Sequence, residues 1–390
     1  MKKIGIVTHY YHSLNYGGNL QAYALSVWLK QRGYDAKQIG FDYTKGNSNL
    51  MHTGKTSKIK KIRELGVSGI LKRISNKILL KLMEPKIEQK RKKRAEAFRF
   101  FNSELIPNTD KVYTMDTIAE SLDAFDVFIT GSDQVWNLQW YNSIFFLDFV
   151  PSTKTKISYA ASIAQKALNE KQKEVFRNSL KGYKAISVRE GSAVDLIKDC
   201  SPSVPQLVVD PTLLLAKEDW DKVSSNRLID EKYILCYFLG ENKAERKLAT
   251  RFAKQNNLKI VFIPMLYASA PMTDKGFGDV AMESASPQDF LSLIKHAEYV
   301  FTDSFHAVVF SNIYQKQYFV FNRSKKGEMS SRIVDITELF HQKDRFCAGK
   351  EKENMQYITS LPDIDYTKDN EDFEKIKQES IAFLEKNLKD

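Results

Sequence analysis

Short apolar runs alternate with helical patterns from the start of this chain. The first run, Lys3–Thr8, is followed by apolar residues at helical spacing up to Gly33, a residue that suits the end of a helix. Tyr34–Asp42 is then predicted to be a second strand. This strand–helix–strand opening favours a parallel sheet with right-handed crossovers.

The same pattern restarts in the second half of the chain. A predicted strand at Lys232–Gly240 precedes a helix over 242–257 and another strand over 258–264. We therefore predict an α/β fold with two Rossmann-like domains, 1–220 and 221–390, whose parallel sheets are flanked by helices. The amphipathic pattern over 371–388 predicts a terminal helix that could pack back on the N-terminal domain.

Composition is that of an ordinary water-soluble protein, with 43% hydrophobic and 27% charged residues. No apolar stretch reaches the roughly 18 residues that a membrane-spanning helix needs. The N-terminal apolar run is too short for a signal peptide, so the sequence predicts a cytoplasmic protein.

Cysteine and histidine spacing gives no sign of a metal centre. The three cysteines are far apart and form no CxxC pair, and the six histidines show no HExxH spacing. We predict neither a disulfide framework nor a metal site.

The positive charge is concentrated in one segment. Lys55–Phe100 holds sixteen Lys and Arg against four Glu, a balance of +12, whereas the whole chain carries +11. The segment lies in a predicted helical insertion over about 55–105 and lacks the basic–aromatic interleaving of a nucleic-acid binder. A solvated helical face is the plainest interpretation, and nucleic acid is not an expected partner.

Four polar clusters follow predicted strands: Asn15–Gln21, Gly131–Asn137, Arg189–Glu190 and Asp303–His306. Ligands of such folds bind at the carboxyl ends of strands. If the two domains face each other, these clusters could line one cleft.

Two of the clusters suit a sugar, but each also has a structural explanation. Gly17 and Gly18 permit close approach to an anion or a sugar hydroxyl, or they form a tight turn capped by Asn15 or Asn19. Asp133, Gln134 and Trp136 offer a stacking face and directional hydrogen bonds, or they are a capped turn with a core tryptophan.

The other two clusters suit an anion and proton transfer. Arg189 could make a bidentate contact with a carboxylate or phosphate, or it could form an ion pair with Glu190 or a neighbour. His306 could move protons near neutral pH with Asp303 orienting it, or it could be a buried histidine behind a helix cap.

Taken together and in order, these motifs resemble the polysaccharide pyruvyl transferase family. The matching stretches are NYGGNLQAYAL (Asn15–Leu25), FITGSDQVWN (Phe128–Asn137), SYAASI (Ser158–Ile163), SVRE (Ser187–Glu190), VVDPTLLL (Val208–Leu215), TDSFHAVVFS (Thr302–Ser311) and SSRIVDI (Ser330–Ile336). The resemblance implies a GT-B-like fold. It also implies transfer of pyruvate from phosphoenolpyruvate to two hydroxyls of a sugar, which yields a ketal and phosphate, with phosphoenolpyruvate as co-substrate and no cofactor.

The resemblance also assigns roles. His306 matches the family's essential histidine, with Asp303 beside it as the second expected catalytic residue. The expected donor-binding residues are Arg189, Ser304, Phe305 and Arg332, and the expected acceptor-binding residues are Asn15, Gly17, Gly18, Gln21, Asp133, Gln134 and Trp136. Ser304 stands where family members often carry an arginine, so Arg332 is expected to supply that cation.

The departure at Ser304 keeps two other hypotheses open. One is a glycosyltransferase that uses a nucleotide sugar on the same fold, and the other is a non-catalytic carbohydrate-binding relative. The expected partner is a sugar or a lipid-linked oligosaccharide, and Lys55–Phe100 could then contact an anionic membrane at its inner face.

Overall fold

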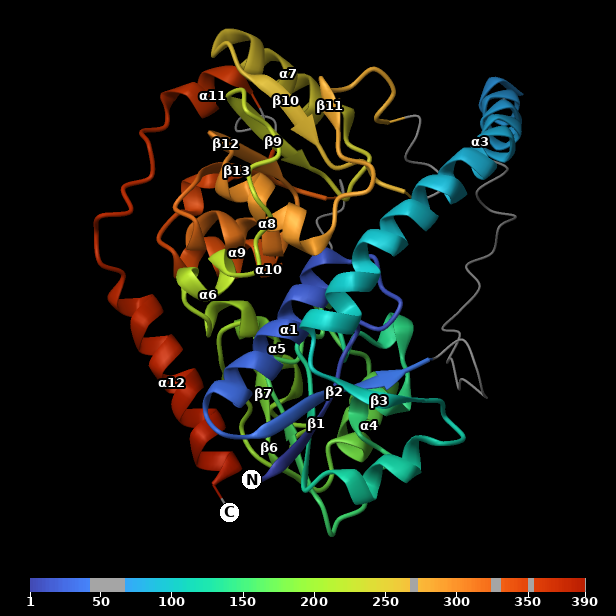
Figure 1. Cartoon of the computed structure of the whole chain (residues 1–390), viewed down its shortest axis with the longest axis vertical. Helices are drawn as coiled ribbons and strands as arrows, with labels where there is room; N and C mark the ends of the chain where they lie inside the picture. Colours follow the sequence, from blue (N-terminus) through green and yellow to red (C-terminus); the bar gives the residue numbers. More distant parts are fainter. Residues whose placement is uncertain (43–66, 267–272, 324–330, 350–353, 390) are drawn as a thin grey trace.

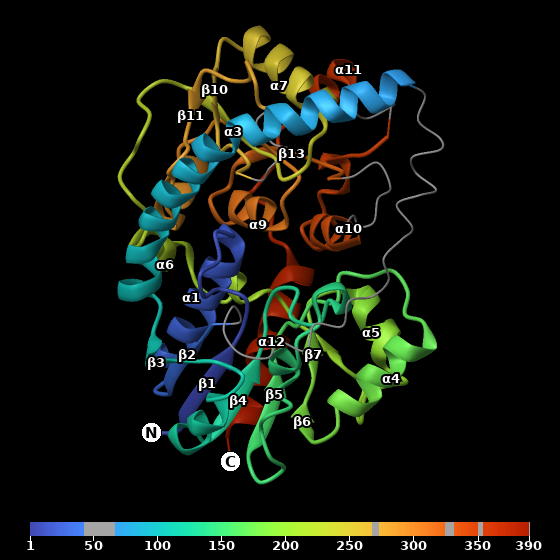
Figure 2. The same ribbon diagram turned by 90° about the vertical axis from the view of Figure 1, so that its right-hand side faces the viewer.

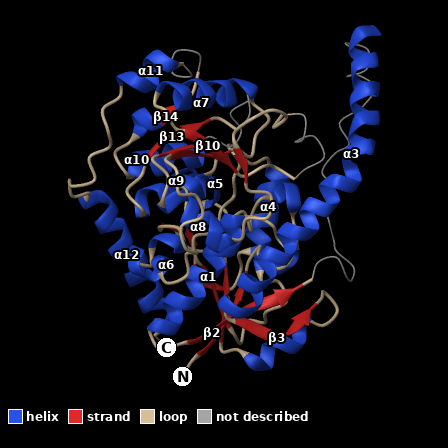
Figure 3. Cartoon of the chain, turned by 45° about the horizontal axis from the view of Figure 1, so that its top comes forward, coloured by secondary structure: helices blue, strands red, loops and turns tan. Residues whose placement is uncertain are grey.

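Two parallel sheets organise the chain in this computed structural model, which describes residues 1–42, 67–266, 273–323, 331–349 and 354–389 and only the backbone of 67–83. Each sheet has six strands and lies among helices, as Figure 3 shows in red and blue. This confirms the predicted fold class. Central strands such as Lys3–Val7 and Tyr233–Tyr237 are near-continuous apolar runs because parallel sheets are covered on both faces.

The first sheet has the order β3-β2-β1-β4-β5-β6. Its strands are β1 (Lys3–Val7), β2 (Asp35–Phe41), β3 (Asn108–Tyr113), β4 (Val127–Thr130), β5 (Thr155–Ser158) and β6 (Tyr183–Ala185). A short parallel pair, β7 (Ser187–Val188) and β8 (Gln206–Leu207), follows it in the chain.

The second sheet repeats the arrangement with the order β11-β10-β9-β12-β13-β14. Its strands are β9 (Tyr233–Tyr237), β10 (Lys259–Phe262), β11 (Val280–Ala281), β12 (Tyr299–Thr302), β13 (Gln317–Phe321) and β14 (Phe346–Cys347). It lies above the first sheet in Figure 1.

The α-helices cover both sheets and connect their strands. They are α1 (Tyr16–Gln31), α3 (Val67–Phe100), α4 (Glu170–Ser179), α5 (Gly191–Ile197), α6 (Lys217–Asp221), α7 (Lys243–Gln255), α8 (Pro287–Lys295), α9 (Phe305–Ile313), α10 (Ser331–Leu339), α11 (Met355–Ser360) and α12 (Glu371–Leu388).

Aromatic residues pack the two halves of the chain together. The ring of Tyr16 at the start of α1 stacks on Phe290 of α8 at 4.8 Å, and its hydroxyl donates to the Ala285 carbonyl at 2.8 Å. Trp220 packs edge-on against Phe310 of α9. One buried cluster therefore runs through both halves, and it fixes how the carboxyl ends of the two sheets face each other.

Two long helices connect the halves, as Figures 1 and 2 show. Helix α12 follows the second sheet in the chain but packs on the first half, where Ser380 Oγ accepts from the Val209 amide at 2.9 Å. Helix α3 packs Phe98 on Tyr16, while Arg94 donates to the Glu283 carbonyl at 2.9 Å. The boundary near residue 220 stays a prediction.

The described part of the basic segment is helical. Residues 55–66 lie outside the described residues, and α3 covers the rest of Lys55–Phe100. Among the described residues, no helix combines the length and the apolar character that crossing a bilayer would require.

Candidate active site

His306 lies where the two halves of the molecule meet. Strand β12 ends at Thr302, Ser304 is the N-cap of α9, and His306 is the second residue of that helix. The side chain is buried, and its Nε2 lies 3.6 Å from Oδ2 of Asp210. Nε2 has no hydrogen-bond partner among the residues that the structure describes, and the carboxylate of Asp210 lies just beyond hydrogen-bonding distance from it.

Gly17 makes room for this imidazole. A Cβ built on Gly17 would lie 1.9 Å from Nδ1 of His306, closer than any real side chain can approach. Helix α1 of the first half and α9 of the second therefore touch at a position that only glycine can occupy.

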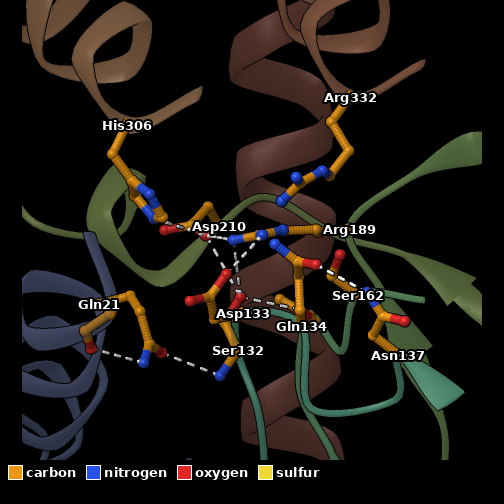
Figure 4. Close-up of polar contacts among 12 residues, drawn as sticks. Gln21, Ser132, Asp133, Gln134, Asn137, Ser162, Arg189, Asp210, His306 and Arg332 are labelled. Atoms are coloured by element: carbon orange, nitrogen blue, oxygen red, sulfur yellow. Dashed lines mark hydrogen bonds and ion pairs between the residues drawn. The ribbon is translucent and has the colours of Figure 1, made fainter. Parts of the chain in front are cut away.

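Arg189 joins the carboxylates beside His306 (Figure 4). It donates to Oδ2 of Asp210 at 2.6 Å and to Oδ1 of Asp133 at 3.0 Å, and the ring of Phe305 lies 4.7 Å from its guanidinium. Its side chain is 1% exposed. The positive charge of Arg189 is thus balanced by the buried carboxylates of Asp133 and Asp210.

The charges around Asp133 and Asp210 keep both carboxylates ionised. Burial alone would raise the pKa of Asp133, but the charge of Arg189 and of other nearby cations outweighs it and lowers the pKa. For Asp210, burial is likewise outweighed by His306 and Arg189, and its pKa falls far below the ordinary value.

Arg332 of α10 reaches the same cluster from the second half. Its Nε lies 3.9 Å from Oε1 of Glu190 and has no hydrogen-bond partner among the described residues. Burial, and then the nearby charge of Arg189, lowers the pKa of Arg332 to about 10. In Figure 4 the side chain points toward Arg189. Arg332 is a buried cation with incomplete partners, which suits an anionic ligand.

A cavity of about 540 Å³ opens at the carboxyl ends of strands from both sheets, and we call it the main cavity. Its lining comes from the segments after β1, β4, β9, β10 and β13 and from α3: His9, Leu14, Asn15, Tyr16, Arg91, Arg94, Asp133, Gln134, Trp140, Asn142, Phe145, Tyr237, Leu239, Pro264, Met265, Leu266 and Arg323. The position is the one where α/β folds bind ligands.

The main cavity carries a surplus of positive charge. Three arginines, Arg91, Arg94 and Arg323, face one carboxylate, that of Asp133, among its described lining residues. Arg94 is only 5% exposed, and one of its terminal nitrogens has no partner among the described residues. Such a lining favours a ligand with negative charge.

The family of the chain follows from comparison with known sequences. A sequence model of the family described as polysaccharide pyruvyl transferase matches residues 15–325, which is most of the chain. This chain belongs to the polysaccharide pyruvyl transferase family. Membership supports a transferase that acts on a sugar or polysaccharide. No curated protein sequence matches the chain.

Solved structures with a similar fold confirm the GT-B-like architecture of this pyruvyl transferase relative. UDP-GlcNAc 2-epimerase from Methanocaldococcus jannaschii has a TM-score of 0.57 at 11% identity, covering 99% of this chain and 100% of that one. UDP-N-acetylglucosamine 2-epimerase from Rickettsia bellii has a TM-score of 0.52 at 10% identity, covering 99% and 96%. At these identities the likeness concerns the fold alone.

The structure overturns the expected role of Asp303 in orienting His306. Both carboxylate oxygens of Asp303 accept backbone N–H groups, from Leu239 and Gly240, at 2.7 Å each. Asp303 thus holds the turn after β9, and Asp210 is the carboxylate next to His306. Asp210 lies in the VVDPT motif after β8, and its position after a strand was the signal that could have singled it out.

The structure also changes the roles expected for the donor-binding residues. Arg189 is placed beside His306 but is neutralised by Asp133 and Asp210, so its free-cation role is not supported. Phe305 covers Arg189, and the Ser304 amide donates to Thr302 Oγ1 at 3.0 Å. Arg323, which follows β13, is a further cation that lines the main cavity.

Of the expected acceptor residues, Asn15, Asp133 and Gln134 line the main cavity, and the others lie behind it. Gln21 is fully buried and accepts from the Ser132 amide at 2.9 Å, so it positions the turn that carries Asp133. Gly18 faces the carbonyl of His9. Gln21, Gly17 and Gly18 therefore shape the site from behind instead of lining it.

Trp136 is a core residue, which corrects its expected role as a sugar platform. Its side chain is fully buried, its indole N–H donates to the Phe145 carbonyl at 3.1 Å, and its ring stacks on Phe146. Trp140, four residues later, is 55% exposed and lines the main cavity. An exposed indole at a cavity is the arrangement that sugar stacking requires.

His9 is a further cavity residue that the sequence analysis missed. It follows β1, and its ring lies 3.9 Å from that of Phe145. Burial lowers the pKa of His9, although Asp133 acts in the opposite direction. A neutral imidazole in the main cavity is equipped to accept a proton. Its position directly after the first strand is the feature that could have identified His9 as a site residue from the sequence.

Proposed function

We propose that this protein transfers the pyruvyl group of phosphoenolpyruvate to two hydroxyls of one sugar in a surface polysaccharide intermediate. The observation that carries the proposal is the arginine surplus of the main cavity in a member of this family. Phosphoenolpyruvate presents a phosphate and a carboxylate, and two anionic groups on a small molecule match a cavity with several arginines.

The donor is placed at the side of the main cavity formed by the second half of the chain. Arg323 lies there. Its Nε is 4.0 Å from Oδ1 of Asp303, and this one nitrogen has no hydrogen-bond partner among the described residues. Arg94 of α3 adds a buried guanidinium, one nitrogen of which has no partner in the described part of the chain. Arg332 stands near Arg323 in a small adjoining cavity and completes the proposed anion site.

The sugar is placed on the opposite side, which the first half of the chain forms. Asn15, Gln134 and Asn142 supply amide groups, Asp133 supplies a carboxylate, and Trp140 supplies a stacking face. Directional amide and carboxylate hydrogen bonds with an aromatic platform suit a pyranose ring.

The chemistry needs two proton movements that balance. A proton is added to the methylene carbon of phosphoenolpyruvate, one sugar hydroxyl bonds to the central carbon, and the carbon–oxygen bond to phosphate breaks. The second hydroxyl then bonds to the same carbon and closes the ketal. One hydroxyl proton ends in the new methyl group and the other leaves with phosphate.

The proposal assigns these transfers to two histidines: His9 lines the main cavity, and His306 lies against Gly17 next to it. In the proposed scheme His306 protonates the methylene carbon through Nε2, the atom that lies 3.6 Å from the Asp210 carboxylate. His9, whose pKa is lowered, accepts the proton of the attacking hydroxyl. No metal or further cofactor takes part in the scheme.

The proposed activity is tested by phosphate release and by product mass. Purified protein is mixed with phosphoenolpyruvate and a set of free and lipid-diphosphate-linked oligosaccharides, and products are searched for a pyruvyl ketal. His306→Asn should lower turnover by about 10²- to 10⁴-fold, whereas His341→Asn on the exposed surface should not. Equal phosphate release by His306→Asn and wild type would refute the assignment.

Helix α3 supports a second part of the proposal, contact with an anionic membrane. Lys86, Lys92 and Lys93 are exposed on the same helix whose Arg91 and Arg94 line the main cavity. Docking of α3 on lipid would bring the cavity close to a lipid-linked acceptor at the cytoplasmic face. Co-sedimentation with vesicles containing phosphatidylglycerol should fall in the Lys86/Lys92/Lys93→Gln variant, and unchanged sedimentation would exclude this contact.

A further inference from the structure

A second cavity of about 670 Å³ lies on the other side of the segment that joins β1 to α1, and we call it the neutral cavity. Its walls are this segment, the last turns of α3, and the start of β3. Leu14 lines both cavities. The two cavities are therefore neighbours.

The charge of the neutral cavity differs from that of the main cavity. Arg99 and Asp110 are the charged residues among its described lining, so their charges cancel. The main cavity has a surplus of two positive charges on the same count. The neutral cavity thus offers no attraction to phosphate or carboxylate, and the ligand class that it suits is uncharged.

Polar atoms without partners border this cavity. The Tyr10 hydroxyl, Asn102 Oδ1 and Asn108 Oδ1 are buried and lack any hydrogen-bond partner among the described residues. The Tyr10 side chain is 1% exposed, so bulk water does not readily serve its hydroxyl. Buried polar groups without partners are costly, and ligand hydroxyls would supply the missing bonds.

Aromatic rings provide the remaining part of a sugar site. The rings of Tyr11 and His12 stack at 4.1 Å with an angle of 22° between them, and both residues line the neutral cavity. A flat stacked pair beside amide oxygens that can accept from hydroxyls suits a pyranose ring.

We propose that the neutral cavity binds an uncharged sugar residue of the acceptor, adjacent to the sugar that is modified in the main cavity. That it is part of the acceptor rests on the proposed function, whereas sugar binding itself does not. The enzyme would then recognise a chain of at least two sugars, with Leu14 bordering both sites.

The test blocks the cavity without touching the catalytic groups. Ala95 of α3 lines the neutral cavity and is exposed, so Ala95→Trp fills it from one wall, and Ser103→Trp fills it from another. Gln89→Trp, on an exposed position of the same helix outside this lining, is the matched control. Each protein is applied to an array of neutral hexose and N-acetylhexosamine oligosaccharides, and phosphoenolpyruvate binding is measured in parallel.

We expect wild type and Gln89→Trp to bind the same oligosaccharides and both cavity variants to lose at least tenfold in affinity. Phosphoenolpyruvate binding should be equal in all four proteins, which shows that they are folded. Oligosaccharide binding that survives both cavity variants, or no binding by wild type, would overturn the inference. Failure of the proposed function would instead appear as absent phosphoenolpyruvate binding in every protein while oligosaccharide binding still responds to Ala95→Trp.

Discussion

Gly17 of α1 lies directly against the imidazole of His306 in α9, so closely that a Cβ on Gly17 would fall 1.9 Å from Nδ1. The two residues come from different halves of the chain. The position of the histidine therefore depends on how the halves pack, and the packing at this point depends on the absence of a side chain.

Gly17→Ala is expected to displace His306 and abolish turnover. The added methyl group would force the imidazole out of its present position, with a stability cost of about 1–3 kcal/mol for overpacking. Gly191→Ala is the control, because a Cβ there meets nothing within 4 Å. Phosphate release and urea unfolding are measured for both. Normal turnover in Gly17→Ala would show that the position of His306 is not critical.

Arg189→Met is expected to destabilise the fold by about 3–5 kcal/mol, since it leaves buried carboxylates without their cation. Asp210 and Asp133 lie at 2.6 Å and 3.0 Å from this guanidinium. The control is Arg177→Met, which breaks an exposed pair with Glu170 and should change little. The measurement is the free energy of unfolding of both variants, obtained from urea titration. Equal values for the two variants would mean that the buried cluster adds nothing to stability.

Asp335 is expected to make stability fall as pH rises. Burial, and then the nearby charge of Glu190, raises the pKa of Asp335 to about 6 from its ordinary value of 3.8. The folded state therefore holds a proton that the unfolded state releases, and stability is lost between about pH 4 and pH 6. Asp335→Asn should remove this slope and stabilise the protein at pH 7 by roughly 1–2 kcal/mol, after allowance for solvent screening.

Urea unfolding of wild type and Asp335→Asn at several pH values between 4 and 7 tests this expectation. The difference between the two proteins should grow as pH rises and level off above the folded pKa. A constant difference over this range would mean that Asp335 does not titrate in it.

His9→Gln is expected to slow turnover by about 10²-fold or more while phosphoenolpyruvate binding is retained, because an amide cannot accept the hydroxyl proton. The lowered pKa of His9 further predicts that the wild-type rate holds as pH falls to 6.5, the ordinary pKa of histidine. Single-turnover phosphate release over this pH range is the measurement. A His9→Gln rate equal to that of wild type would assign the proton transfer elsewhere.

Much of the fold could be predicted because parallel strands are buried on both faces. Strands such as β1 and β9 are therefore near-continuous apolar runs that stand out in the sequence. The polar motifs after them also indicated the edge of each sheet where the cavity lies, since ligands bind at the carboxyl ends of strands.

Partners within the site could not be predicted in the same way. The glycine pair indicated a close approach, but that Gly17 meets His306 depends on contacts between helices of different halves. Asp303 is the nearest carboxylate to His306 in sequence, yet its oxygens are used by the turn after β9, and Asp210 from another segment takes the place beside the imidazole. Local sequence carries little information on such long-range contacts.

The tryptophans show the same limit. Trp136 and Trp140 lie in one polar stretch, and local spacing does not say which indole turns into the core. The chain buries Trp136 against Phe146 and leaves Trp140 at the cavity. Burial is decided by the aromatic cluster around Phe146, which draws on several segments.

The central claim is that the main cavity binds phosphoenolpyruvate through its arginines, and calorimetric titration of the purified protein tests it most directly. We expect saturable binding to wild type and to Arg251→Gln, a control on the exposed face of α7, and at least tenfold weaker binding to Arg323→Gln and Arg94→Gln. Binding of UDP-GlcNAc in place of phosphoenolpyruvate, or equal phosphoenolpyruvate affinity in all four proteins, would contradict the account.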